Sequence, residues 1–272
     1  MGAASVIKRL AAAASAVCVI CAAGGVTGTA SDDRIELPVI PVKVEPVVLN
    51  ENGFKYIVLA DDTAELTGCF RENADTLIIP AELGGKRVSS IAEKAFAAGN
   101  SFDTVVIPVT VERLAANTFF KADIKTVIVP PTVTEMPGNA VYTKAMYEAY
   151  LAFMQSLPGG DTGELDLYGE DIIAPVGDAL EIKCSVGSAA ETAADSIGAK
   201  KTLMRGYTAM TGDTDCNGIC NNRDLKQLQT YITTGDKSVL TPSFDTDGNG
   251  VINNSDIKLL QSSLTGIDVK IY

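Results

Sequence analysis

A short apolar frame recurs three times in the middle of the chain, and this repetition constrains the fold more than any other feature. Each copy begins with valine, places an apolar residue three positions later and ends in a pair such as Ala95-Phe96 at a fixed offset. The starting residues are Val88, Val111 and Val133, so the copies lie 23 and then 22 residues apart. A fixed period of this size is the signature of a solenoid, in which each unit packs against its neighbours.

An apolar, mostly β-branched triplet followed by proline precedes each copy of the frame. These segments are residues 77–80, 105–108 and 127–130. Each triplet predicts a short strand, and the proline ends its hydrogen bonding because proline has no N–H to donate. The chain then reverses its direction over the residues of the frame. One unit cannot bury its apolar face alone, so we expect the units to stack.

These units resemble the BspA-like leucine-rich repeats of bacterial surface proteins. The resemblance rests on the Ile-Pro steps at 79–80 and 107–108, the Gly-Gly insertion at 84–88 and the Ala-Phe ending at 95–96. It covers residues 54–141 and resumes at 181–204, where 187–191 look like the closing repeat of that family. The resemblance implies an α/β solenoid over residues 54–205 that binds a protein or a surface. It identifies no ligand, because such proteins bind through variable surface residues.

The stretch 142–157 departs from the repeats, because its apolar and aromatic residues follow helical spacing. A Pro-Gly-Gly sequence at 158–160 ends this stretch. We therefore expect a helical insertion over residues 140–175. An insertion on a solenoid often lies on its binding face, and a helix that caps the stack is the alternative.

Two segments near the C-terminus, residues 213–224 (loop one) and 245–256 (loop two), share one plan. Each has oxygen-bearing side chains at positions 1, 3, 5 and 12 and glycine at position 6. Calcium needs this spacing, because the ion takes six or more oxygen ligands and position 7 supplies a backbone carbonyl. The predicted ligands of two Ca²⁺ ions are Asp213, Asp215, Asn217, the carbonyl of Ile219 and Asp224, and then Asp245, Asp247, Asn249, the carbonyl of Val251 and Asp256.

Both loops are followed by apolar residues at i, i+3 and i+7, which predicts an amphipathic helix after each. Turns rich in Asp, Asn and Gly that bind no metal are the alternative, and such turns are common singly. Residues 211–266 carry seven aspartates against four basic residues, so two calcium ions would change the net charge from −3 to +1. We expect this segment to fold only weakly without calcium.

An EF-hand needs a helix before each loop, and the short glycine-bracketed segment before loop one does not predict one. The order loop–helix, linker, loop–helix resembles a dockerin, the module that binds a cohesin domain of a scaffoldin. The resemblance covers about residues 212–266. It implies a dockerin domain over residues 206–268, a small all-α fold of two F-hand motifs with a calcium-dependent cohesin interface. Carried onto this chain, the cohesin-contacting residues are Asn222, Arg223, Gln229, Thr230, Asn254, Ser255, Gln261 and Ser262.

The two halves of this module nearly match on their outer faces. Near-symmetry fits binding in either of two orientations, and a recent internal duplication is the alternative. Arg223 stands where the second half has Ser255, which favours one orientation. The family often has basic residues at the positions of Gln229 and Gln261, so the cohesin type does not follow from this sequence.

The first thirty residues have the pattern of a secretory signal peptide, with Lys8 and Arg9, an apolar run over 10–26 and small residues at 28–30. A membrane anchor is the alternative. After cleavage no segment is long and apolar enough to span a bilayer. We therefore expect a secreted protein, extracellular or attached to the cell surface through a scaffoldin. Residues 31–53, with three prolines among valines, predict an extended lead-in.

Composition narrows the function. The chain has 34 acidic against 22 basic residues, which disfavours nucleic acid as a partner, and it contains no histidine and no tryptophan. We expect a non-catalytic binding protein. One alternative is a polysaccharide-degrading enzyme that uses carboxylates alone, with candidates Asp61, Asp62, Glu164, Asp166, Glu170 and Asp171. The other is a peptidase-binding or inhibitory module that acts through residues 158–160.

Four cysteines follow the signal peptide, namely Cys69, Cys184, Cys216 and Cys220. They are too sparse for a disulfide framework, so we expect small buried apolar side chains. We expect Cys216 to be exposed and Cys220 to pack, and a disulfide between these two is the alternative.

Overall fold

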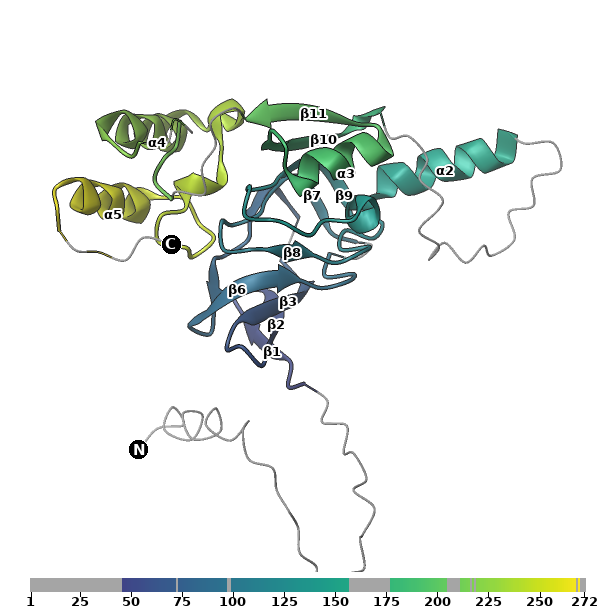
Figure 1. Cartoon of the computed structure of the whole chain (residues 1–272), viewed down its shortest axis with the longest axis horizontal. Coiled ribbons are helices and arrows are strands. Elements are labelled where there is room, and N and C mark those ends of the chain that lie inside the picture. Colours follow the sequence, from purple (N-terminus) through teal and green to yellow (C-terminus); the bar gives the residue numbers. More distant parts are fainter. Residues whose placement is uncertain are drawn as a thin grey trace, which may run out of the picture. The chain divides into compact units, whose positions relative to one another are not determined.

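We describe the protein from a computed structural model (Figure 1). The structure describes residues 46–71, 73–96, 99–156, 177–204, 211–215, 217, 219–267 and 269. The chain divides into two units, Met1–Val44 and Glu45–Tyr272, and every described residue belongs to the second. The predicted signal peptide, most of the lead-in, the end of the helical insertion and Cys216 therefore lie outside the described residues.

One sheet of the repeat region is parallel throughout and has the strand order β11-β10-β9-β7-β4. Its strands are β4 (Ala74–Ile78), β7 (Ser101–Val106), β9 (Asp123–Ile128), β10 (Gly177–Ser185) and β11 (Ala199–Met204). The first three include most of the apolar triplets, so the strands predicted there are confirmed. Pairing brings equivalent repeat residues side by side, with Leu77 opposite Val105 and Val105 opposite Val127.

The other sheet has the order β1-β2-β3-β6-β5, and β8 also pairs with β6. Its strands are β1 (Leu49–Glu51), β2 (Phe54–Val58), β3 (Ala64–Cys69), β5 (Glu82–Leu83), β6 (Lys86–Ile91) and β8 (Arg113–Leu114). Ser90 of β6 pairs with Arg113, which bridges to Glu135, so the register repeats the sequence period of 23 and 22 residues. The last residues of the predicted lead-in form β1, which pairs with β2.

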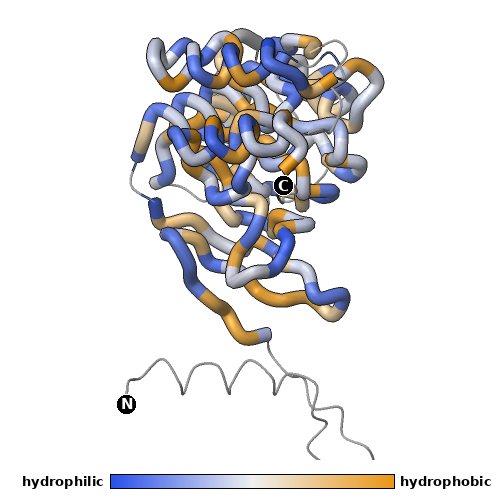
Figure 2. The backbone as a smooth tube through the Cα atoms, turned by 90° about the vertical axis from the view of Figure 1, so that its left-hand side faces the viewer, coloured by the Kyte–Doolittle hydropathy of each residue, from blue (hydrophilic) through white to orange (hydrophobic). Residues whose placement is uncertain are grey.

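The frame residues form the core between the strands. Val88, Val111 and Val133 are buried, and the rings of Phe96 and Phe119 stack with their centroids 5.0 Å apart. Along the tube in Figure 2, hydrophobic and hydrophilic stretches alternate through the repeats, as expected for a chain that turns a corner after each strand. The recurring apolar residues therefore bury one continuous core.

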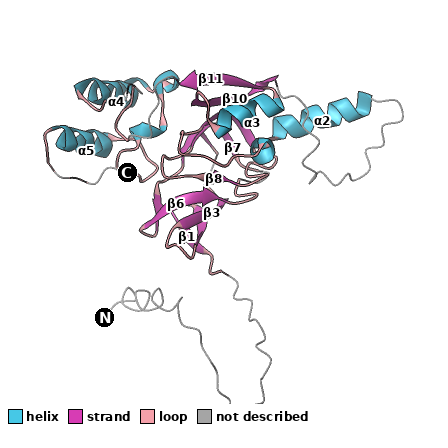
Figure 3. Cartoon of the chain, viewed as in Figure 1, coloured by secondary structure: helices cyan, strands magenta, loops and turns pink. Residues whose placement is uncertain are grey.

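Helices follow and interrupt the repeats (Figure 3). A 3-10 turn, Gly138–Val141, leads into α2 (Lys144–Ser156), which lies within the helical stretch predicted over 142–157. Met146 and Tyr150 of α2 are buried. Helix α3 (Ala189–Ile197) connects the parallel strands β10 and β11, and Ser188 caps its N-terminus by accepting from the Glu191 N–H.

The C-terminal segment is helical and consists of α4 (Asn222–Thr234), two short 3-10 turns (Lys237–Val239 and Pro242–Phe244) and α5 (Asn254–Leu264). The first three residues of α4 and of α5 are also the last three residues of a predicted calcium loop. The helices expected after both loops are therefore confirmed. We refer to residues 211–266 as the loop–helix module. No helix in the described part of the chain has both the length and the apolar character that a bilayer crossing requires.

Candidate metal sites in the loop–helix module

Three aspartates from each loop place carboxylate oxygens within 4.8 Å of one another. The two triads are Asp213, Asp215 and Asp224 in loop one, and Asp245, Asp247 and Asp256 in loop two. In both triads the aspartates at positions 1 and 12 are buried and the one at position 3 is half-buried. Carboxylates that share a buried site repel one another unless a cation or a proton neutralises them. The structure thus contains two clusters that could hold a metal ion.

The start of the following helix holds the carboxylate at position 12 in place. Asn221 caps α4, and Oδ2 of Asp224 accepts the Asn221 backbone N–H at 2.8 Å, which completes a capping box. Asn253 and Asp256 repeat this arrangement at the start of α5, also at 2.8 Å. Oδ1 of Asp224 accepts from the N–H of Asp215, a loop residue, at 3.1 Å. The last ligand position is therefore fixed by helix capping as well as by the loop.

The loop backbone turns around the aspartate at position 1. Oδ1 of Asp213 accepts the Asn217 N–H at 3.0 Å, and Oδ2 of Asp245 accepts the Gly250 N–H at 2.8 Å. The predicted carbonyl ligands, at Ile219 and Val251, accept from the side chains of the capping asparagines at 3.0 and 3.1 Å. The Ile219 and Val251 side chains are exposed, so these two residues can contribute to a site only through their backbone.

Two further pairs of residues shape the sites and were not found from the sequence. The first pair is the capping asparagines, which an Asn-x-x-Asp pattern before an apolar run could have indicated. The second is Thr214 and Thr246 at loop position 2, both buried. Their hydroxyls donate to the backbone carbonyls of Asp224 at 3.1 Å and Asp256 at 3.0 Å, joining the beginning of each loop to the beginning of its helix.

The donor set fits a hard divalent cation. Each loop offers three carboxylates and an asparagine amide oxygen, and these are the ligands that calcium prefers. Oδ1 of Asp215 is buried and has no hydrogen-bond partner among the described residues. A buried carboxylate oxygen without a partner is costly in a folded protein, and a metal ion would satisfy it.

Burial dominates the electrostatics of loop two. Desolvation raises the pKa of Asp245 to about 7; the hydrogen bond from Gly250 opposes this, and the charges of Asp256 and Asp247 reinforce it. Burial likewise raises the pKa of Asp256. The folded pKa of Asp245 lies above its ordinary value of 3.8, so without metal its contribution to stability is lost as pH rises from about 4 through about 7.

Binding of a divalent cation at loop two should therefore release protons. At about pH 6.5 we expect roughly half a proton or more to leave for each ion bound, because Asp245 must be deprotonated to act as a ligand. Titration calorimetry in two buffers of different ionisation enthalpy measures this number. The Asp245→Asn variant should release fewer protons, and equal release from the variant and the wild type would contradict this assignment.

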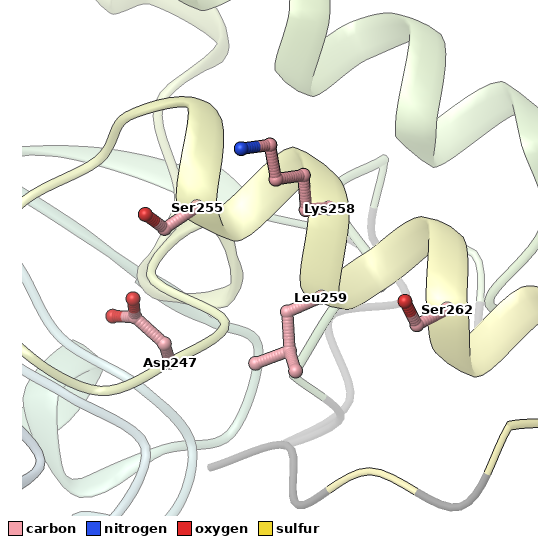
Figure 4. A pocket seen from close by; sticks show the side chains of 5 residues that line it. All are labelled: Asp247, Ser255, Lys258, Leu259 and Ser262. Atoms are coloured by element: carbon pink, nitrogen blue, oxygen red, sulfur yellow. The ribbon is translucent and has the colours of Figure 1, made fainter.

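The predicted cohesin contacts lie on the surface of the module. Seven of them are exposed and Ser262 is half-buried. A hollow of about 300 Å³ lies between loop two and α5 (Figure 4), lined by Asp247, Ser255, Lys258, Leu259 and Ser262. In the first half, Nε of Arg223 lies 3.5 Å from Oδ2 of Asp215, at the position equivalent to Ser255 beside Asp247. The two halves therefore present different surfaces at this point.

The structure describes three of the four cysteines and two of the carboxylates considered for catalysis. Cys69, Cys184 and Cys220 are free thiols; Cys184 is buried and the other two are half-buried. Asp61 accepts from the N–H and hydroxyl of Thr63, and these bonds lower its pKa, while Asp62 forms an ion pair with Lys86 at 2.5 Å. The remaining carboxylate candidates and the Pro-Gly-Gly segment lie outside the described residues.

No family model matches the sequence, and neither does any curated protein. Among solved structures, the chain is similar to a leucine-rich cell surface protein from Faecalibacterium prausnitzii A2-165. The match has 24% sequence identity and a TM-score of 0.32, and it covers 37% of this chain. The matched region of this chain corresponds to 30% of the length of the leucine-rich protein.

Proposed function

We propose that the protein is an exported, non-catalytic binding protein that attaches to a scaffold through its loop–helix module. The observation that carries this proposal is the pair of aspartate triads, each closed by the first turn of a helix. A single cluster of this kind is a common surface turn. Here two clusters have the same ligand spacing, the same capping box and the same buried threonine. This repetition supports a module that binds two ions.

The ion is calcium in both loops. The ligands are the side chains at loop positions 1, 3, 5 and 12, with the carbonyls of Ile219 and Val251. When bound, the two ions supply positive charge that turns the net charge of residues 211–266 from −3 to +1. The chain's own residues hold the ligands at positions 1 and 12 in place, since hydrogen bonds from the loops and the capping boxes reach Asp213, Asp224, Asp245 and Asp256.

The loop–helix module acts as a dockerin and binds a cohesin domain of a scaffoldin. The residues proposed for this contact lie at the ends of the loops and on the outer faces of α4 and α5, where they are available to a partner. The hollow beside Ser255 and the ion pair of Arg223 make the halves unequal. One of the two binding orientations is therefore favoured.

The repeats form a BspA-like solenoid and present the second binding face. Their parallel strands place equivalent positions of successive repeats side by side, and the exposed ones among them include Asp75, Asp123 and Lys125. Rows of exposed residues suit recognition of an extended ligand such as a protein, a cell surface or a polysaccharide. The complete protein would then bring that ligand to a scaffold outside the cell.

Capture by cohesins tests this function. The full chain without its first thirty residues is exposed to a broad panel of immobilised cohesins, in calcium and again with chelator. Capture in calcium that is lost in chelator, and lost in the double variant Asp213→Asn/Asp245→Asn, is the expected result. Calcium binding with no capture by any cohesin would remove scaffold attachment and leave a stand-alone calcium module.

A further inference from the structure

One row of side chains on the outer face of the parallel sheet is buried against the loop–helix module. Ile78, Val106 and Ile128 are neighbours across β4, β7 and β9, and their exposed fractions are only 9%, 1% and 0%. The residue before each of them, namely Leu77, Val105 and Val127, is buried in the core formed by the frame residues, which we call the repeat core. The three outer side chains form a second core together with Leu228, Leu240, Phe244 and Leu260. We call this second core the shared core.

Loop two touches the end of the first repeat strand directly. The Ala81 N–H, just after the Pro80 that ends this strand, donates to the Gly248 carbonyl of loop two at 2.8 Å. Gly250 has a φ of +79°, and a Cβ at this position would lie 2.9 Å from the Ile78 carbonyl oxygen. The glycine at loop position 6 is thus required by the close approach of the sheet as well as by the turn.

The first ligand of loop two, Asp245, lies between two residues that contact the parallel sheet or its outer side chains. Asp245 directly follows Phe244, whose ring is fully buried in the shared core. Its carboxylate accepts from the N–H of Gly250, the residue that abuts Ile78. The module and the sheet are also joined by an ion pair, in which Nζ of Lys237 lies 3.7 Å from Oδ2 of Asp75 in β4. Movement of the module away from the sheet would therefore disturb the ligand geometry of loop two.

We infer that calcium binding at loop two and docking of the loop–helix module on the parallel sheet are linked, so that each strengthens the other. This inference rests on the proposed calcium site. Linkage is reciprocal: if docking raises the affinity for calcium, calcium raises the stability of docking by the same factor. Seven of the eight residues proposed to contact cohesin are exposed in the docked module, so calcium would also fix the partner-binding face relative to the repeats.

Hydrogen exchange of the Ala81 amide reports docking directly, because its acceptor lies in loop two. In the full chain we expect calcium to slow this exchange at least tenfold. Asp245→Asn should remove most of the effect, and the matched Asp213→Asn in loop one should keep most of it. Calcium binding with unchanged exchange at Ala81 would overturn the linkage and spare the proposed site. Failure of both loops to bind calcium would overturn the proposed site and the linkage with it.

Adjacent valines of β7 provide a second, matched test. Val106→Ala truncates a side chain in the shared core, and Val105→Ala makes the same truncation in the repeat core. With loop one inactivated by Asp213→Asn, we expect Val106→Ala to weaken calcium binding at loop two three- to tenfold. Val105→Ala should change it less than twofold, although it also removes buried methyl groups. Equal effects of the two variants on calcium affinity would overturn the linkage.

Discussion

Chelation of calcium is expected to lower the free energy of unfolding of the loop–helix module by about 4 kcal/mol for each loop, at free calcium of about a thousand times the Kd. The physical reason is the arrangement of the carboxylates. Without metal, four aspartates are buried in two clusters, and in loop two Asp245 keeps a proton only below about pH 7. Denaturant unfolding followed by far-UV circular dichroism, in calcium and in chelator, measures the loss.

Magnesium is the matched control for this experiment. It is smaller than calcium, requires near-octahedral geometry and releases its waters reluctantly, so it should restore little of the lost stability. Equal unfolding midpoints with calcium and with chelator would show that the triads are turns that need no ion. Equal stabilisation by both metals would argue for screening of charge rather than for ligand sites.

Phe244→Ala is expected to destabilise the loop–helix module by about 3–5 kcal/mol. The Phe244 side chain is fully buried in the shared core, and its ring lies 5.2 Å from that of Tyr231 on α4. Its removal leaves a cavity between the module and the parallel sheet. Thermal unfolding of the calcium-loaded full chain measures the change.

Phe70→Ala provides the control, because Phe70 is 50% exposed and lies outside both cores. We expect its effect to stay within about 0.5 kcal/mol. If the two variants lose similar stability, or if Phe244→Ala loses less than about 1 kcal/mol, then the shared core does not hold the module on the sheet.

Local features were predictable because their determinants are short. The strands β4, β7 and β9 each contain the first two residues of an apolar, mostly β-branched triplet ended by proline, and their parallel pairing follows from the fixed period. The carboxylate triads follow from ligand spacing within twelve residues, which forces the side chains inward once the chain turns at glycine. The helix over 144–156 follows from apolar spacing in the same way.

The docking of the module was not predictable, because it depends on contacts between residues far apart in the chain. One indication was present. An uninterrupted apolar triplet such as Leu77-Ile78-Ile79 is typical of a strand buried on both faces. The sequence does not say what covers the second face, because Phe244 and Leu260 satisfy the pattern of an independent helical module equally well. The close approach of Gly250 to Ile78 could not be predicted either, because the sharp turn of a calcium loop is by itself a sufficient reason for glycine at this position.

Native mass spectrometry of the full chain in the presence of calcium tests the central claim most directly, because it counts bound ions. We expect two calcium ions on the wild type, one on Asp245→Asn, one on Asp213→Asn and none on the double variant. A wild-type chain that carries no calcium, or whose bound calcium is unchanged in the double variant, would contradict the two sites and everything proposed from them.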